Sequence, residues 1–589
     1  MRRILWLAPL LCAPLFLVGL GSTGLADPDE GRNAEVGREM LATGDYVTPH
    51  INGAVYLDKP PVFFWAVAAS LGAFGVNEAA ARLPSALAAI AGVTLTVWFA
   101  RRHFGTRVAA GAAAILALSP LYVVFARLVI FDMLLLVWTT ASTLLFYEAM
   151  EGERPSRFAG IAGFALAGIG TITKGPVALV VPLLVAVAWA LVRRRPGLLA
   201  RLRPGIGLLA YLAVILPWLL LVESRQPGFL AYAILGENLA RMTANPYDTA
   251  RPFYFYAHVV LPGLFPWVLL LLVQGIAAGW SRLRGGGGAA ESSARAAGPG
   301  TETAETAEAR AARFVAVWLG VLLLFFSAIA SKRPSYILPA AVPVALLAAR
   351  LIVRASEQIG LEARRRAVGS IVVAVAILLV AAVGFVASRG VGSTAVLSRS
   401  GGSMGDAGVS PALLALAAAA LLAAGALLIV VRGTRRPALY VAVAALPFLS
   451  LLPVARAAAR HVDTARSSRA VSRYLLGRLG SEDRVVCFEE YKPGLNFYLA
   501  RPIGQVTRAG RIFTSNYIAT HLATLRTDPQ FRLMEPAALQ SALRDPGART
   551  YVLAPRKEYD ALRETAGLPL RPVWEEGGFG LFLPEGSGG

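Results

Sequence analysis

A stretch rich in acids and bases follows the first hydrophobic segment, and its residue types could do chemistry. It begins with Asp27-Pro-Asp-Glu30, continues through Arg32 and ends in Tyr56-Leu-Asp-Lys-Pro-Pro61. A charged loop between two membrane spans is costly to keep near lipid unless its charges have water, partners or substrate. We therefore interpret residues 22–83 as the loop that carries a candidate active site.

Lysine is rare in this chain, which makes its positions informative. Only five of the 57 basic residues are lysine, and three of them lie in the hydrophobic part: Lys59, Lys174 and Lys332. Each stands at the outward end of an expected span, against the usual enrichment of positive charge on the cytoplasmic side. A compact ammonium at the level of the lipid headgroups suits a phosphate ligand. The alternative is a lysine that only reaches the surrounding headgroups.

Two more charged residues narrow the chemistry. Asp132 stands inside an apolar run just after Arg127, and an acid within a span is expected to face the protein interior. Its alternative role is an ion pair with Arg127 or another arginine that only fixes the helix bundle. Arg241 lies in an outward loop, where the alternatives are a phosphate ligand and a solvated arginine.

Ligands for a divalent metal are also present in the outward loop, namely Asp58, Glu30 and His50. His258 is the other histidine on the outward side of the hydrophobic part, and a lone histidine is more often only hydrogen-bonded. The two cysteines, Cys12 and Cys487, provide neither a disulfide framework nor a metal knuckle. The cofactor therefore stays open, with a divalent metal as the candidate.

The composition places these residues in a membrane protein. The chain of 589 residues is 56% hydrophobic and only 16% charged, with a mean hydropathy of +0.59. Soluble domains carry about 25% charged residues, so a soluble globule is excluded. Apolar runs long enough for a bilayer of about 30 Å predict about thirteen spans, at 4–21, 84–100, 108–125, 129–149, 158–173, 176–192, 205–222, 257–280, 314–330, 336–353, 368–387, 411–431 and 438–454.

Arginine placement orients the spans, because cytoplasmic loops collect positive charge. Clusters such as Arg193-Arg194-Arg195 and Arg364-Arg365-Arg366 fall on one side if the N-terminus is inside. The loop 22–83 and everything after 455 then face outward. The net charge of +21 is spread over these loop ends, so nucleic-acid binding is not expected. Met1 to Ala26 also resembles a cleavable signal peptide, but its long apolar run favours retention as the first span.

Two domains follow from this pattern. Residues 1–455 form a transmembrane domain with a Gly- and Ala-rich cytoplasmic linker at 281–313. Residues 456–589 form a periplasmic α/β domain, with strands expected at apolar runs and helices at the intervening stretches. The expected strands are 484–488, 495–499, 550–554 and 579–583, and the expected helices are 462–480, 535–545 and 557–566. Segment 31–43 is expected to be an interfacial helix, and capping its N-terminus is the alternative role for Asp27 or Asp29.

The ordered motifs carry a resemblance to a known family. They are the stretch from Asp27 to Tyr46, then Pro49-His-Ile-Asn-Gly, Tyr56-Leu-Asp-Lys-Pro-Pro, Ala81-Arg-Leu-Pro-Ser, Thr173-Lys-Gly-Pro and Ser331-Lys-Arg-Pro-Ser-Tyr-Ile-Leu-Pro. Together they resemble the bacterial aminoarabinose (4-amino-4-deoxy-L-arabinose) transferases and the wider dolichyl-phosphate-mannose protein mannosyltransferase superfamily. These enzymes are GT-C glycosyltransferases. The resemblance runs over roughly 27–340, is specific for the superfamily and says little about the sugar.

The resemblance implies transfer of a sugar from a polyprenyl phosphate, usually undecaprenyl phosphate, to lipid A or a protein on the periplasmic side of the inner membrane. It implies that Asp29 and Asp132 are the two catalytic acidic residues. Lys59, Arg32, Tyr336 and Arg241 would bind the donor phosphate, with Lys332 and Lys174 at the same level. The chain departs from the family at Asp58, where glutamate is usual, and at Asn238, where some members carry histidine. Both departures argue against the family's metal contact.

The chemistry of such a transfer fits these residue types. A leaving phosphate dianion needs an electrostatic clamp, for which Lys59, Arg241 and Tyr336 are suited. Asp29 is the natural general base for a hydroxyl acceptor, whereas it would orient the donor if the acceptor is a phosphate on lipid A. A lipid flippase is the alternative, for which internal repeats are expected and none is found. A scaffold without catalytic activity would not need Asp29, Lys59 and Asp132 together.

Overall fold

The structure is a computed structural model that describes residues 8–152, 156–233, 251–283, 306–358, 463, 466–508, 515–525 and 532–586. The chain divides into two compact units. Unit 1 contains residues 1–21, 33–353 and 515–528, and unit 2 contains residues 22–32, 354–514 and 529–589. Each unit therefore includes a short piece of chain that is remote in sequence from the rest of it. The predicted domain boundary at 455 lies outside the described residues.

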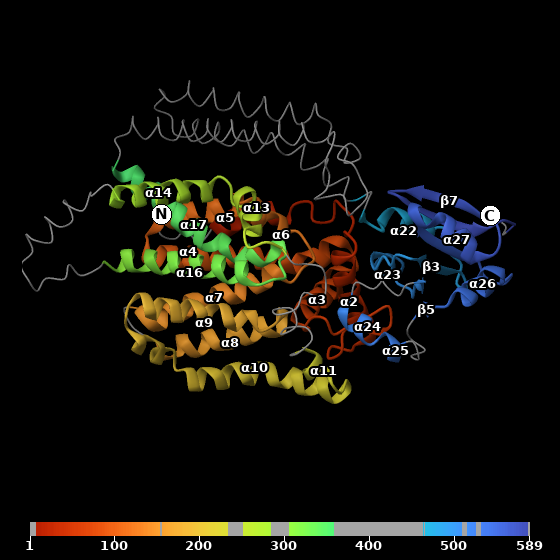
Figure 1. The fold of residues 1–589 in the computed structure, drawn as a ribbon, viewed down its shortest axis with the longest axis horizontal. Coiled ribbons are helices and arrows are strands. Elements are labelled where there is room, and N and C mark those ends of the chain that lie inside the picture. The colour runs from red at the N-terminus through yellow and green to blue at the C-terminus, as the bar shows by residue number, and fades with distance from the viewer. Residues whose placement is uncertain are drawn as a thin grey trace, which may run out of the picture. The chain divides into compact units, whose positions relative to one another are not determined.

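Unit 1 is a helix bundle (Figure 1). Each of the first ten predicted spans coincides with one helix or one pair of successive helices. The elements of the bundle are α1 (Ala8–Leu17), α4 (Glu78–His103), α5 (Thr106–Leu118), α6 (Pro120–Ala126), α7 (Asp132–Glu151), α8 (Arg157–Lys174), α9 (Val177–Val192), η2 (Pro196–Leu202), α10 (Pro204–Arg225), α11 (Phe229–Ala231), α13 (Phe255–Gly263), α14 (Trp267–Leu283), α16 (Ala307–Ala328), η4 (Pro334–Ala340) and α17 (Ala341–Gln358). The last three predicted spans, 368–387, 411–431 and 438–454, lie outside the described residues.

Length and composition allow several of these helices to cross a membrane. Among the described residues, five helices are long and apolar enough, and two bent pairs raise the number to seven. The pairs are α5 with α6, bent by 66°, and α13 with α14, bent by 114°. A proline stands at each break, Pro120 at the start of α6 and Pro266 between α13 and α14, and proline lacks the N–H needed to continue the helical hydrogen bonds. The predicted number of thirteen spans stays a prediction.

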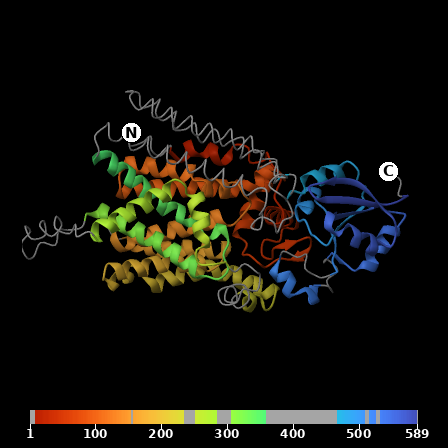
Figure 2. The same cartoon turned by 45° about the horizontal axis from the view of Figure 1, so that its top comes forward.

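Helix α7 lies at the centre of the bundle. It contacts α4, α8 and α9, and 89% of its apolar 18-residue stretch is buried, against 28% of the corresponding stretch of α10. In Figures 1 and 2 the helices α7, α8 and α9 run side by side, with α10 next to α8. The hydroxyls of Thr139 and Thr143 are satisfied inside the bundle by carbonyls one turn earlier in α7. The central position of α7 matters because the helix begins at Asp132.

The first loop contains regular structure of its own. Helix α2 (Asp29–Thr43) confirms the predicted helix at 31–43, and α3 (Val62–Phe74) begins after Pro60-Pro61. Between them, β1 (His50–Ile51) and β2 (Ala54–Val55) form a hairpin. Its turn is Asn52-Gly53, where both residues have positive φ, as a tight two-residue hairpin requires.

Unit 2 is built on a six-stranded mixed sheet with the strand order β5-β4-β3-β6-β8-β7. Strands β3, β4, β5 and β6 are parallel to one another, and β8 pairs antiparallel with β6 and β7. The predicted α/β organisation of the tail is therefore confirmed. The strands are β3 (Arg484–Phe488), β4 (Gly504–Val506), β5 (Leu533–Met534), β6 (Thr550–Pro555), β7 (Leu570–Glu576) and β8 (Phe579–Pro584), and the helices packed with them include α22 (Arg469–Leu476), α26 (Pro536–Arg544) and α27 (Tyr559–Ala566).

One predicted strand of the tail is wrong. Residues 495–499 belong to helix α23 (Gly494–Leu499). The helix begins after Pro493 and ends at Ala500, which has the left-handed conformation and donates its N–H to the carbonyl of Asn496. A short apolar run fits a buried helix turn as well as a strand, so periodicity could not separate the two.

Candidate active site

Three of the predicted site residues meet inside unit 1. The ammonium of Lys174 forms an ion pair and hydrogen bond with Oδ1 of Asp132, and it lies 4.8 Å from the centre of the Tyr336 ring. The side chains of Lys174 and Asp132 are only 13% and 9% exposed. These residues form the Asp132–Lys174–Tyr336 cluster. The predicted alternative of an Asp132–Arg127 pair is not found, because Arg127 donates to the carbonyls of Leu15 and Phe16.

Helix ends position this cluster. Asp132 is the first residue of α7, Lys174 is the last residue of α8, and Tyr336 lies in η4. A carboxylate at a helix N-terminus and an ammonium at a helix C-terminus both match the helix dipoles. Gly175 has a φ of 138° and ends α8 directly after the lysine, which accounts for Thr173-Lys-Gly-Pro in the sequence. The dipoles therefore add to the attraction that holds the ion pair at the ends of these two helices.

Aromatic residues surround the cluster. Tyr256 of α13 is 2% exposed, donates its hydroxyl to the carbonyl of Arg333, and lies close enough to Tyr336 and Asp132 to interact electrostatically with both. Phe326 of α16 packs against Tyr256 and Tyr336, with ring centres 6.3 and 6.1 Å apart. Sequence reasoning missed Tyr256, although the aromatic run Phe253-Tyr-Phe-Tyr256 is a usable signal.

Lys332 is buried and held by backbone. Its ammonium donates to the carbonyls of Arg251, at 3.0 Å, and Ile329, at 2.5 Å. Burial lowers the pKa of Lys332. These contacts differ from those of a lysine that reaches out to lipid headgroups, and they fix the turn between α16 and η4 that leads to Tyr336.

Lys59 and Asp58 lie where the first loop meets a segment of the tail that belongs to unit 1. The Asp58 carboxylate accepts hydrogen bonds from the backbone N–H groups of Asn516 and Tyr517, at 2.9 and 2.7 Å, and from the Tyr232 hydroxyl at 3.2 Å. The ammonium of Lys59 donates to the backbone carbonyl of Asp58 at 2.7 Å. The tail segment thus fixes the residue directly before Lys59.

The tail segment consists of α24 (Asn516–Thr520) and α25 (Leu522–Leu525). Ser515 caps α24 by accepting from the N–H of Ile518, so Asp58 and Ser515 together satisfy the free N–H groups of its first turn. The ring of Tyr517 stacks on His521 at 4.2 Å and meets Tyr232 edge-on at 5.1 Å. Sequence reasoning missed this segment, because nothing in its local sequence shows that it packs on the first loop.

The residues present do not fit a metal site. No three His, Cys, Asp or Glu residues come together to hold an ion anywhere in the part of the chain that the structure describes. Both oxygens of Asp58 already accept hydrogen bonds, and a Glu30 oxygen accepts the N–H of Ala26 at 3.0 Å. His50 lies in strand β1. The set of Asp58, Glu30 and His50 is therefore not assembled, and we derive no step through a metal.

Asp29 and Arg32 stand on the first turn of α2. Their side chains form an ion pair of 2.5 Å, in which Asp29 is 52% exposed and Arg32 is 12% exposed. Asp29 is the first helical residue, and residues 22–32 belong to unit 2. The exposed carboxylate is accessible to a substrate, whereas the arginine is held among protein atoms.

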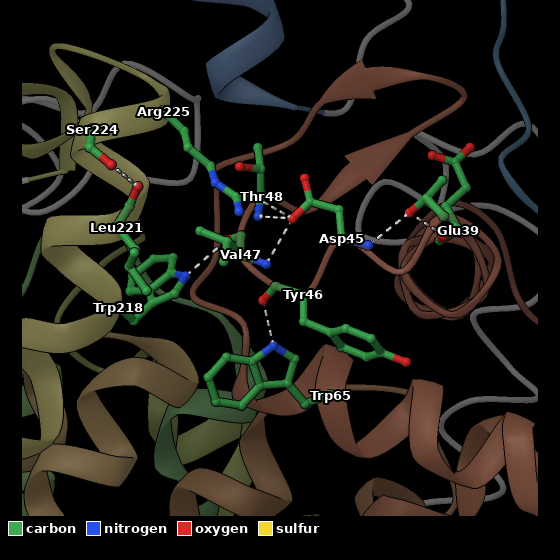
Figure 3. A network of polar contacts seen from close by, with 11 residues as sticks. Glu39, Asp45, Tyr46, Val47, Thr48, Trp65, Trp218, Leu221, Ser224 and Arg225 are labelled. Atoms are coloured by element: carbon green, nitrogen blue, oxygen red, sulfur yellow. Dashed lines mark hydrogen bonds and ion pairs between the residues drawn. The ribbon is translucent and has the colours of Figure 1, made fainter.

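The rest of the first loop is held by a polar network (Figure 3). Asp45 accepts from the N–H groups of Val47 and Thr48 and pairs with Arg225 of α10 at 2.9 Å. Two tryptophans donate their ring N–H to loop carbonyls, Trp65 to Tyr46 at 2.8 Å and Trp218 to Val47 at 2.9 Å. Figure 3 shows Arg225 pointing toward Asp45 and both indoles pointing at the loop. Helices α3 and α10 therefore fix the conformation of residues 45–48.

His258, a histidine considered in the sequence, lies apart from these contacts. His258 of α13 packs against Tyr254, with ring centres 5.8 Å apart. Arg241 lies outside the described residues, as does Asn238. The predicted site residues Asp29, Asp132, Lys59, Lys174 and Tyr336 thus fall into three described groups, which are the Asp132–Lys174–Tyr336 cluster, the Asp58–Lys59 turn and the Asp29–Arg32 turn.

Comparisons with known proteins bear on this arrangement. Residues 15–233 match the sequence model of the dolichyl-phosphate-mannose-protein mannosyltransferase family. The undecaprenyl phosphate-alpha-4-amino-4-deoxy-L-arabinose arabinosyl transferase of Aeromonas salmonicida is 33% identical over 352 residues, which are 59% of this chain and 60% of the relative. That of Edwardsiella ictaluri is 31% identical over 59% of this chain and 58% of its own length. The alignments thus span less than two thirds of these relatives.

The fold extends the similarity over nearly the whole chain. The crystal structure of ArnT from Cupriavidus metallidurans bound to undecaprenyl phosphate superposes with a TM-score of 0.75 and 24% identity, covering 98% of this chain and 97% of that one. The apo structure of the same protein gives a TM-score of 0.74 with the same identity. The predicted resemblance is confirmed: this chain is a helical membrane protein with the GT-C fold of ArnT, similar in sequence to the aminoarabinose transferases and the mannosyltransferase family.

Proposed function

We propose that the protein is a glycosyltransferase that moves a sugar from an undecaprenyl-phosphate donor to lipid A or a protein on the periplasmic side of the inner membrane. The observation that carries this proposal is the Asp132–Lys174–Tyr336 cluster, in which a poorly exposed ammonium lies between a carboxylate and the ring of a tyrosine. The names of the relatives support the polyprenyl-phosphate donor. No comparison supports the flippase alternative.

The residues suggest a single displacement. The bond between the sugar C1 and the phosphate oxygen breaks, the electron pair leaves with the phosphate, and an acceptor oxygen bonds to C1. Lys59 and Tyr336 would stabilise the dianion that leaves, because charge-assisted hydrogen bonds strengthen as negative charge develops. If the acceptor is a hydroxyl, its proton passes to the Asp29 carboxylate, which is exposed enough to receive it.

The function is tested with purified protein in detergent or vesicles. Undecaprenyl-phosphate aminoarabinose is supplied with lipid A or with a periplasmic protein fraction, and the products are measured by mass spectrometry. We expect release of undecaprenyl phosphate in step with a mass increase of one acceptor. Donor that crosses the bilayer without being consumed would support the flippase and contradict the proposal.

Replacing Lys59 by alanine is expected to weaken the binding of undecaprenyl phosphate by about 10- to 100-fold, because a charge-assisted hydrogen bond is worth roughly 1.5–3 kcal/mol. Lys59→Arg should recover only part of the affinity, since the guanidinium is larger and planar. Lys557→Ala is the matched control, because Lys557 is an exposed lysine in the short helix η6 (Arg556–Glu558). Unchanged affinity in the Lys59 variant would make this residue a headgroup anchor.

The topology gives a further prediction. We propose that the first loop and the C-terminal domain face the periplasm and that the loop after α9 faces the cytoplasm. Cysteines at Ala42 and Glu564, both exposed, should then react with an impermeant maleimide in spheroplasts. A cysteine at Gly197 should not react, although a side chain there would meet no atom within 4 Å. Labelling of Gly197→Cys together with protection of Ala42→Cys would show the opposite topology. The first loop would then face the cytoplasm, which would contradict the use of a lipid-linked donor.

A further inference from the structure

The beginning of the first loop is packed with the C-terminal part of the chain inside unit 2. Residues 22–32 belong to this unit, and Ala26 forms an antiparallel bridge with Ser467. Both backbone and side chains make the connection. The hydrogen bonds run from the N–H of Asp27 to the carbonyl of Arg466 at 2.9 Å, from the N–H of Leu25 to the Tyr498 hydroxyl at 2.8 Å, from the N–H of Gly24 to Oδ1 of Asp463 at 2.7 Å, and from Arg469 to the carbonyl of Ser22 at 3.3 Å.

The carboxylate of Asp27 is the centre of this connection. Its Oδ1 accepts the N–H of Gly494 at 2.7 Å, and its Oδ2 accepts the hydroxyl of Ser468. Burial raises the pKa of Asp27 to about 6, against the opposing effect of the nearby Lys492 ammonium. Lys492 is itself 6% exposed and lies 3.7 Å above the ring of Phe579. The tail thus supplies a charge partner and two hydrogen-bond donors for one loop acid.

The fit around Asp27 leaves no room for larger neighbours. A Cβ on Gly31 would lie 2.1 Å from Oδ1 of Asp27 and 2.7 Å from the nitrogen of Gly494. A Cβ on Gly494 would lie 2.8 Å from the Asp27 carboxylate. The glycine four residues after Asp27 is therefore explained by the contact with the tail, since only glycine allows this approach.

The same segment carries Asp29 and Arg32. Two backbone hydrogen bonds close the first turn of α2. The N–H of Glu30 donates to the carbonyl of Ala26 at 2.9 Å, and the N–H of Arg32 donates to the carbonyl of Pro28 at 3.0 Å. The N–H of Ala26 also donates to the Glu30 carboxylate, so hydrogen bonds of both backbone and side chain close the turn from residue 26 onward. An exposed carboxylate at position 29 then depends for its location on where Asp27 is fixed.

We propose that Asp27 is a positioning residue: it fastens residues 24–32 to the C-terminal domain and so sets the location of Asp29 and Arg32 for the reaction. The inference rests on the proposed function, in which Asp29 contacts the substrate. It gives the C-terminal domain a role in turnover through contacts with the loop, whatever the acceptor is. The donor-binding residues Lys59 and Tyr336 lie in unit 1 and do not depend on this anchor.

The first test compares Asp27→Ala with Asp483→Ala in the full-length protein. Asp483 is the matched control, because it is another acid of unit 2 that accepts hydrogen bonds from a backbone N–H and a side chain, here those of Gly480 and Arg549, and its bonds do not involve residues 22–32. We expect Asp27→Ala to lower kcat about 100-fold, the loss typical of a catalytic group displaced by about 1 Å, with KM for the donor little changed. Asp483→Ala should keep the wild-type kcat.

Hydrogen exchange provides a readout that does not depend on activity. Amides of residues 24–32 should exchange faster in Asp27→Ala, and those of the sheet strands should not. If the exchange of residues 24–32 is unchanged, Asp27 is not the anchor. If these residues are released and kcat stays at the wild-type value, the anchor has no part in the reaction. A wild-type protein without transferase activity would contradict the proposed function. The exchange data would still show whether Asp27 fastens residues 24–32 to the C-terminal domain.

A disulfide supplies the rescue. Ala26 and Ser467 face each other across the antiparallel bridge, a placement whose Cα separation suits a disulfide, so Ala26→Cys and Ser467→Cys are the cysteines to introduce. In the Asp27→Ala background, the oxidised disulfide should restore most of the kcat, and reduction should remove the gain. Lack of rescue by the formed disulfide would overturn the proposal. If Asp27→Ala does not fold, Ser468→Ala removes only one of the two donors and should give a smaller loss of kcat with the same rescue.

Discussion

The Asp29→Asn variant is expected to lose sugar transfer by about 10²- to 10⁴-fold in kcat, the range attributed to a positioned acid or base. Asparagine keeps the shape of the side chain but can neither accept a proton nor carry negative charge. The loss is expected for both acceptor classes. A hydroxyl acceptor loses its general base, and a phosphate acceptor loses the charge that orients the donor and balances positive charge developing on the sugar.

The stability of this variant should stay close to that of the wild type. Asp29 is 52% exposed, and its ion pair with Arg32 is worth at most about 1 kcal/mol at such a site. The melting temperature measured by fluorescence in detergent checks this. Asp45→Asn is the matched control, because the remaining oxygen still accepts from Val47 and Thr48 while only the pair with Arg225 is lost. Near-normal turnover by Asp29→Asn would refute the assignment of this acid.

Breaking the pair between Asp132 and Lys174 is the second large effect that we expect. Either Asp132→Asn or Lys174→Gln leaves a poorly exposed charge without its partner, and such a change costs about 3–5 kcal/mol. Both single variants should therefore show a reduced free energy of unfolding together with a loss of transfer. The single variants cannot separate a structural pair from a catalytic one.

The double variant Asp132→Asn/Lys174→Gln makes that separation. With both charges removed, neither is left uncompensated, so most of the lost stability should return. If the pair acts in the reaction, the double variant stays inactive although it is stable. Recovery of activity along with stability would mean that the pair only fixes α7 to α8. Purified protein, a melting curve and a donor turnover assay suffice for all three variants.

The sequence by itself determined the class of protein and most of its residues of interest. Apolar length predicted ten helices or helix pairs of the bundle between α1 and α17, because bilayer thickness imposes a length that can be counted. The rarity of lysine marked Lys59, Lys174 and Lys332, and the first-loop motif marked Asp29, Arg32 and Asp58. Strands β3, β6 and β8 also followed from local pattern, because each is a compact apolar run.

Only the tertiary structure decided which of these residues are partners. Asp132 pairs with a lysine 42 positions away, and Asp27 bonds a serine 441 positions away. Asp58 meets Tyr517 across 459 positions, and that contact occupies an acid which the sequence had suggested as a metal ligand. Local sequence does not predict such contacts, because each joins segments that are far apart in the chain and meet only in the folded structure. Tertiary packing determines which charged and hydrogen-bonding residues become partners. The length of a span and the charge of a loop are instead determined by whether the segment lies in lipid or in water.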